Sequence, residues 1–88
     1  MIKKEFEIKN NLGLHARAAA LFVQTTNKFA SDIFVEKDNQ KVNAKSIMGI
    51  MALGVPKNSK IVIAIDGVDE KEAMEKLTKL INEDLLKL

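Results

Sequence analysis

The chain has 88 residues, of which 47% are hydrophobic and 30% charged, a composition typical of one small globular domain over residues 1–88. A formal net charge of +2, with lysines spread along the chain, argues against nucleic-acid binding, and the absence of cysteine excludes disulfides and thiolate zinc sites. No apolar run approaches the ~20 residues of a membrane span, and no signal-peptide core is evident, so we expect a cytoplasmic protein.

The first half of the chain predicts a strand, a helix and a hairpin. Residues 2–8 alternate between apolar and charged side chains, which is typical of a strand with one buried face. Residues 10–13 form a loop, and residues 16–28 carry apolar side chains at helical spacing. Alternating runs within residues 33–43, joined by a turn at Asp38-Asn39, predict a β-hairpin.

The second half predicts a short helix, a strand and a final helix. Ser46 is a suitable N-cap for the short helix. Residues 60–66 alternate isoleucine with smaller apolar side chains and form the strongest predicted strand. Asp69 and Glu72 have the spacing of a capping box, which predicts a final helix whose apolar stripe extends to Leu85.

These elements give the order strand, helix, strand, strand, helix, strand, helix. Each strand has one strongly apolar face, and an antiparallel sheet covered on that face by helices satisfies this pattern. We therefore predict an α+β fold, an open-faced β-sandwich in which a four-stranded antiparallel sheet carries three helices on one side.

The only histidine, His15, stands where a glycine-containing loop meets the first predicted helix. The first backbone N–H groups of a helix lack internal partners, and the helix dipole adds positive charge, so anions bind there. Imidazole is a nucleophile at cytoplasmic pH, and Arg17 adds a planar cation that suits phosphate oxygens. The residues alone leave two readings open: a phosphoryl acceptor, or a histidine that merely caps the helix or lies on the surface.

Two sequence motifs resemble those of one known family. Residues 12–19, LGLHARAA, resemble the active-site motif of HPr, the histidine-containing phosphocarrier of the bacterial phosphoenolpyruvate-dependent sugar phosphotransferase system. Residues 42–51, VNAKSIMGIM, resemble the second signature of that family, around its regulatory serine. The spacing of the two motifs and the length of the chain also match. One departure is Ala18, where the family usually has proline, which leaves one more N–H free at the start of the helix.

The resemblance implies a carrier rather than an enzyme, with no cofactor and no metal. His15 would accept a phosphoryl group on Nδ1 from enzyme I and pass it to the sugar-specific enzyme IIA components. Arg17 would balance the charge that moves between donor and acceptor. Because successive partners must reach the histidine, we expect a monomer.

For Ser46, the residues alone indicate an N-cap. The resemblance adds a regulatory phosphorylation by an ATP-dependent HPr kinase/phosphorylase, and binding of a catabolite-control repressor to the phosphorylated form. Phosphate at a helix start is tolerated by the fold, so its effect would come from about two negative charges on a docking face.

The short second helix has more apolar residues than one buried stripe needs. The simplest reading buries Ile47, Ile50 and Met51, which have helical spacing, and we keep that reading for Ile50. We predict a partner-binding patch from the others, because methionine adapts to several partners. The resemblance extends this patch onto the first helix; its predicted members are Ala20, Gln24, Ile47, Met48 and Met51.

Two alternatives remain. One is an HPr-like regulatory paralogue; a class of such paralogues has lost the histidine and keeps only the serine, and the presence of His15 argues against that class. The other is a non-catalytic α/β interaction module without phosphoryl chemistry.

Overall fold

The computed structural model describes all 88 residues and has the predicted order of elements. The strands are β1 (Ile2–Glu7), β2 (Asp32–Lys37), β3 (Gln40–Asn43) and β4 (Lys60–Asp66). The helices are α1 (Ala16–Thr26), α2 (Ile47–Leu53) and α3 (Glu70–Asn82), followed by the 3₁₀ turn η1 (Asp84–Lys87).

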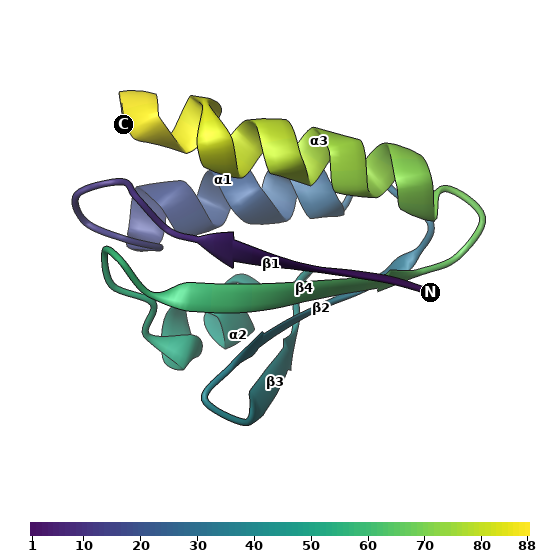
Figure 1. Ribbon diagram of the computed structural model, residues 1–88, viewed down its shortest axis with the longest axis horizontal. Coiled ribbons are helices and arrows are strands. Elements are labelled where there is room, and N and C mark those ends of the chain that lie inside the picture. Colours follow the sequence, from purple (N-terminus) through teal and green to yellow (C-terminus); the bar gives the residue numbers. More distant parts are fainter.

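The strands form one antiparallel sheet in the order β1-β4-β2-β3. Figure 1 shows the helices gathered on one side of this sheet, with α3 and α1 along its β1 edge and α2 near β3. The predicted open-faced β-sandwich is confirmed.

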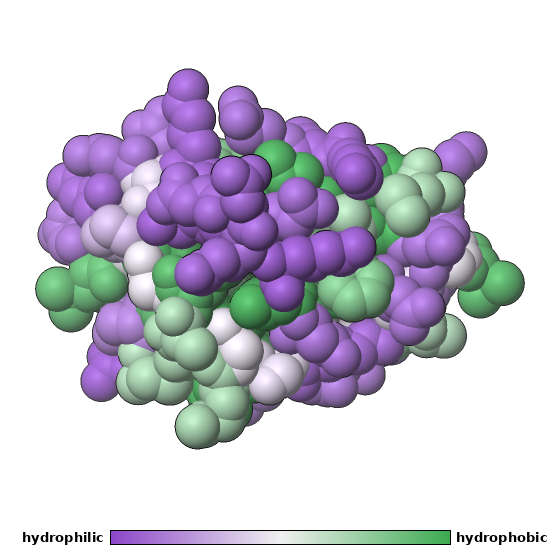
Figure 2. Space-filling model, turned by 90° about the horizontal axis from the view of Figure 1, so that it is seen from below, coloured by the Kyte–Doolittle hydropathy of each residue, from purple (hydrophilic) through white to green (hydrophobic).

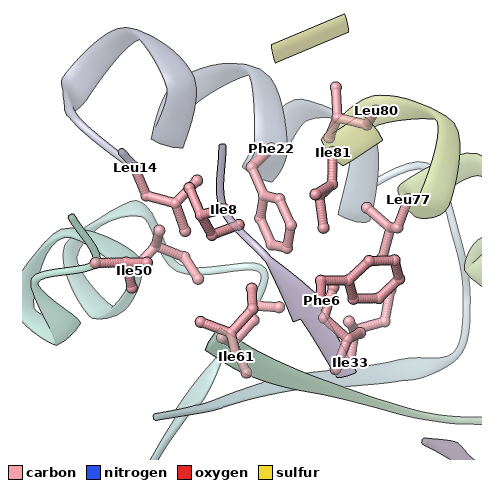
Figure 3. Close-up of a cluster of buried hydrophobic side chains, with 14 of the residues drawn as sticks. Phe6, Ile8, Leu14, Phe22, Ile33, Ile50, Ile61, Leu77, Leu80 and Ile81 are labelled. Atoms are coloured by element: carbon pink, nitrogen blue, oxygen red, sulfur yellow. The ribbon is translucent and has the colours of Figure 1, made fainter. Parts of the chain in front are cut away.

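The core lies between the sheet and the helices because the alternating strands present one apolar face each. Ile33 pairs with Ile65 and Val35 pairs with Ile63 across β2 and β4, and all four side chains are buried. The register thus stacks branched side chains side by side, as sheets favour. Phe22 of α1 and Leu77 of α3 close the core from the helical side (Figure 3).

The start of α3 differs from the prediction. Asp69 precedes the helix but makes no capping hydrogen bond within it, and Glu72 is exposed. Instead, the Asp69 carboxylate accepts hydrogen bonds from the Ala30 N–H at 2.8 Å, and from the N–H and hydroxyl of Ser31. The capping-box prediction is therefore wrong, because a loop 38 residues away competes successfully for the carboxylate.

The end of α3 also differs. The helix ends at Asn82, and Leu85 belongs to η1 rather than to the α3 stripe. Leu85 is nevertheless fully buried, because the 3₁₀ turn keeps it on the core side. The predicted burial of Leu85 is confirmed, although its place in the final helix is not.

Candidate active site

The loop before α1 is held against the segment that follows α2. Gly13 has a φ of +61°, a conformation that favours glycine, and a Cβ there would lie 2.1 Å from the Val55 carbonyl oxygen. The Leu14 N–H donates to the same oxygen at 2.9 Å. The Leu14 side chain is buried beside Ile8 and Ile50 (Figure 3). Packing on both sides of the loop therefore fixes the residue that follows it, His15.

His15 occupies the N-cap position of α1 with an extended backbone. Its side chain is half-buried and makes no capping hydrogen bond. Its Nδ1 instead lies 3.2 Å from the carbonyl oxygen of Gly13. The reading of His15 as a capping side chain is therefore wrong, and the ring is held by one contact of a single nitrogen.

The first turn of α1 offers free donors beside this ring. The Ala19 N–H is the first that bonds within the helix, to the His15 carbonyl at 2.7 Å, so the three preceding N–H groups have no acceptor in the chain. The N–H of Ala18 is one of these three, and a proline at this position would lack it. Arg17 is exposed and takes part in none of the ion pairs. A hollow lined in part by Leu12, His15 and Arg17 opens here. This arrangement can bind an anion.

Ser46 is the N-cap of α2, as predicted. Its Oγ accepts a hydrogen bond from the Gly49 N–H at 3.1 Å. Gly54 ends the helix with a φ of +64°, the usual left-handed termination. Ser46 as a whole is half-buried.

Helices α1 and α2 run antiparallel, because both ends are tied together. At the end of α1, the Thr26 hydroxyl donates to the Ala44 carbonyl at 2.8 Å, and at the other end Leu14 bonds to Val55. Helix α2, seven residues long and thus about 10 Å at 1.5 Å per residue, separates Ser46 from the loop that carries His15.

The outer face of α2 is apolar and exposed. Met48 is 76% exposed, Met51 45% and Ile47 39%, whereas Ile50 is fully buried, as expected for it. Figure 2 shows hydrophobic side chains gathered at the lower left of the view, where α2 lies, between hydrophilic regions. On the neighbouring helix α1, Gln24 is exposed and Ala20 half-buried. We call the group of Ala20, Gln24, Ile47, Met48 and Met51 the α1/α2 face.

Asn10 is a residue of this site that the sequence did not single out. It is only 5% exposed, and its side-chain amide donates to the same Gly13 carbonyl that faces His15. A polar residue within a predicted loop looks like ordinary loop composition, so no signal in the sequence marked it.

Two further properties concern the whole chain. No three His, Asp or Glu side chains are grouped so that they could hold a metal ion. None of the helices combines the length and the apolar character that crossing a membrane requires.

Comparison with known proteins defines the family. The family model described as "PTS HPr component phosphorylation site" matches residues 2–83. The chain is 52% identical to the HPr-like protein Crh of Halalkalibacterium halodurans, over 96% of this chain and 100% of the relative. It is 51% identical to the phosphocarrier protein HPr of Neisseria meningitidis, over 93% of this chain and 92% of that protein. The chain therefore belongs to the HPr family of the phosphotransferase system.

Solved structures of relatives have the same fold. HPr-C-His from Thermoanaerobacter tengcongensis is 56% identical and gives a TM-score of 0.94, covering 100% of this chain and 98% of the other. A structure described as an HPr dimer from the same organism gives a TM-score of 0.77, covering 97% of this chain and 98% of the other.

Proposed function

We propose that this protein is a cytoplasmic phosphocarrier of the sugar phosphotransferase system, which accepts a phosphoryl group on His15 from enzyme I and donates it to enzyme IIA components. The observation that carries this proposal is the arrangement at the start of α1: a half-exposed imidazole beside free N–H groups and an unpaired Arg17. Family membership supports the same role.

The chemistry follows from these groups. The neutral ring, with its hydrogen on Nε2, uses the lone pair of Nδ1 to form a bond to phosphorus. The bond from phosphorus to the donor atom breaks, the donor keeps that electron pair, and the ring loses no proton. The free N–H groups of the first turn and the Arg17 guanidinium offset the charge of the phosphoryl oxygens. Since the group leaves by the reverse step, the protein is a carrier rather than an enzyme.

Ser46 is the proposed regulatory site. A kinase of the HPr kinase/phosphorylase type would transfer phosphate from ATP to its hydroxyl, adding about two negative charges beside the α1/α2 face. This charge would weaken an acidic partner and create a site for a basic one, such as a catabolite-control repressor.

The similarity to Crh at 52% identity favours a second candidate, a regulatory HPr-like protein that acts through Ser46 alone. The two candidates differ in what His15 does. A regulatory protein needs no phosphoryl chemistry at the start of α1.

One experiment separates the candidates. The protein is incubated with phosphoenolpyruvate and enzyme I, and we expect one acid-labile, base-stable phosphate that is absent from His15→Ala. A wild-type protein that takes no label, or label that persists in His15→Ala, would contradict the carrier role. In parallel, ATP and a cognate kinase are expected to label the protein but not Ser46→Ala.

A further inference from the structure

Asn10 and His15 share one hydrogen-bond acceptor. The Nδ2–H of Asn10 donates to the Gly13 carbonyl oxygen, and the Nδ1 of His15 lies 3.2 Å from the same atom. The backbone closes the turn as well, because the Gly13 N–H donates to the Asn10 carbonyl at 3.0 Å. Both Asn10 and Gly13 are buried, so this oxygen has little access to water.

Packing and hydrogen bonds on both sides of Gly13 hold its carbonyl oxygen in place, so it cannot move towards another donor. Gly13 packs directly on Val55 and Pro56, where even a Cβ would meet backbone atoms at 2.1 to 2.9 Å. On its other side, Leu14 is anchored in the core and hydrogen-bonded to Val55. The only side chains that supply a donor to the oxygen are those of Asn10 and His15.

We propose that Asn10 is a positioning residue for phosphoryl transfer, because its amide keeps the Gly13 carbonyl hydrogen-bonded whether or not His15 contacts it. This inference rests on the function proposed above. When Nδ1 bonds to phosphorus, it has no hydrogen left to donate to that oxygen. A buried carbonyl without a donor is costly, and Asn10 removes that cost from the phosphorylated state.

Asn10 also affects the ring before reaction. Attack on phosphorus requires a free lone pair on Nδ1, whereas a hydrogen bond to Gly13 requires Nδ1 to carry the hydrogen. An oxygen that already accepts a bond from Asn10 attracts a second donor less strongly. Asn10 therefore favours the reactive tautomer, with the hydrogen on Nε2.

The test uses two variants of Asn10 and a matched control. Asn10→Ala deletes the donor, and Asn10→Asp keeps the shape but replaces the donor by an acceptor. Asn27→Ala is the control, because the Asn27 amide donates to the Val23 carbonyl at 2.9 Å at the far end of α1. Circular dichroism verifies that each variant is folded, and Asn10→Asp, with the shape of asparagine, carries the test if Asn10→Ala does not fold.

Two measurements are made on the full-length protein. Nitrogen-15 NMR of the unphosphorylated protein gives the tautomer populations of neutral His15, which a purely structural role of Asn10 would not change. The phosphorylation equilibrium is measured with phosphoenolpyruvate and enzyme I. We expect both Asn10 variants to raise the fraction with hydrogen on Nδ1 and to lower the phosphorylation equilibrium constant by about tenfold, since a buried unsatisfied carbonyl costs a comparable amount.

The outcomes separate this inference from the proposed function. If wild-type protein takes no phosphate on His15, the proposed function fails. If wild-type protein is phosphorylated and folded Asn10 variants keep both its tautomer populations and its equilibrium constant, the role of Asn10 is overturned. An equal loss in Asn27→Ala would also overturn it, because the effect would then be one of general stability.

Discussion

At the scale of single residues, substitution of the exposed Arg17 tests whether its guanidinium assists phosphoryl transfer. Its guanidinium is charged at all relevant pH values and forms a planar fork of donors, whereas lysine offers a point charge. Hydrogen bonds to charged groups contribute about 1.5–3 kcal/mol, so we expect Arg17→Ala to slow transfer from phosphorylated protein to enzyme IIA by about 10- to 100-fold. Arg17→Lys should recover only part of this rate.

The measurement is the single-turnover rate of phosphoryl transfer. Lys71→Ala, an exposed basic residue on α3, serves as the control for the loss of one positive charge. Equal transfer rates for wild-type protein and Arg17→Ala would contradict a role of Arg17 in phosphoryl transfer.

Ser46 has a structural role that is separable from regulation. Its Oγ caps α2, so Ser46→Ala should lower the free energy of unfolding by about 1 kcal/mol, or about 4–8 °C in melting temperature for a domain of this size. Ser46→Asp should keep most of the stability, since aspartate is an equally good N-cap. Urea denaturation of both variants measures this difference; equal stabilities would show that the cap contributes little.

Two glycines with nearly equal φ form a matched pair. Gly13 and Gly54 have φ values of +61° and +64°, but a Cβ at Gly54 meets nothing within 4 Å. Gly54→Ala should therefore cost only the conformational penalty, about 1–2 kcal/mol. Gly13→Ala adds a clash with Val55, and overpacking of this kind costs about 1–3 kcal/mol more. Denaturant titration of the two variants gives the difference in the free energy of unfolding. Equal losses of stability would mean that the loop before His15 can shift to accommodate the added methyl group.

At the scale of elements, Asp69 joins the start of α3 to the loop between α1 and β2. The hydrogen bond from the Ser31 hydroxyl, followed by that from the Ala30 N–H, holds the pKa of Asp69 below its ordinary value. A pKa that is lower in the folded than in the unfolded protein stabilises the fold above the unfolded value of about 3.9. This contribution is lost as the pH falls through the folded pKa.

We therefore expect Asp69→Asn to be less stable than wild-type protein at pH 7, with the difference shrinking below about pH 4. Urea denaturation between pH 7 and pH 2.5 tests this expectation. Glu72→Gln is the control, because Glu72 is exposed and makes no capping bond. A pH profile of Asp69→Asn parallel to that of wild-type protein would contradict the role of the carboxylate.

The same element shows where prediction from sequence succeeds and where it stops. Alternation and helical spacing report burial along one segment, so every strand and α-helix was predicted, although the 3₁₀ turn η1 was not. The Ser46 cap, which involves neighbours in sequence, was also predicted. Asp69 offered the same local signal but bonds to Ser31, and nothing in sequence spacing reports a contact across 38 residues. The proposed role of Asn10 could not be predicted from the sequence, because it depends on the burial of Asn10 and on its contact with Gly13, which only the structure shows.

At the scale of the whole molecule, the two proposed phosphorylation sites lie near opposite ends of α2: Ser46 caps its start, and His15 follows Leu14, which is hydrogen-bonded to Val55 just after its end. The core fixes both ends, through Leu14 near His15 and Ile50 within α2, so the distance between the sites is set by packing rather than by a flexible linker. A partner that covers the α1/α2 face to reach His15 also approaches Ser46. If the proposed function is correct, we expect charge added at Ser46 to change transfer at His15 without any change of fold.

The oligomeric state decides whether this face is available. Two relatives have been described as dimers, one of them with a swapped domain, whereas here β1 pairs along its whole length with β4 of the same chain. The three exposed apolar side chains of α2 form a small patch, whereas stable interfaces bury about 1,200–2,000 Å² in total. We therefore expect a monomer at micromolar concentration, with a radius of gyration close to the 11.4 Å of the Cα trace. Sedimentation velocity and small-angle scattering over a dilution series test this expectation. A concentration-independent dimer would contradict it, and Met48→Asp would then show whether α2 forms the contact.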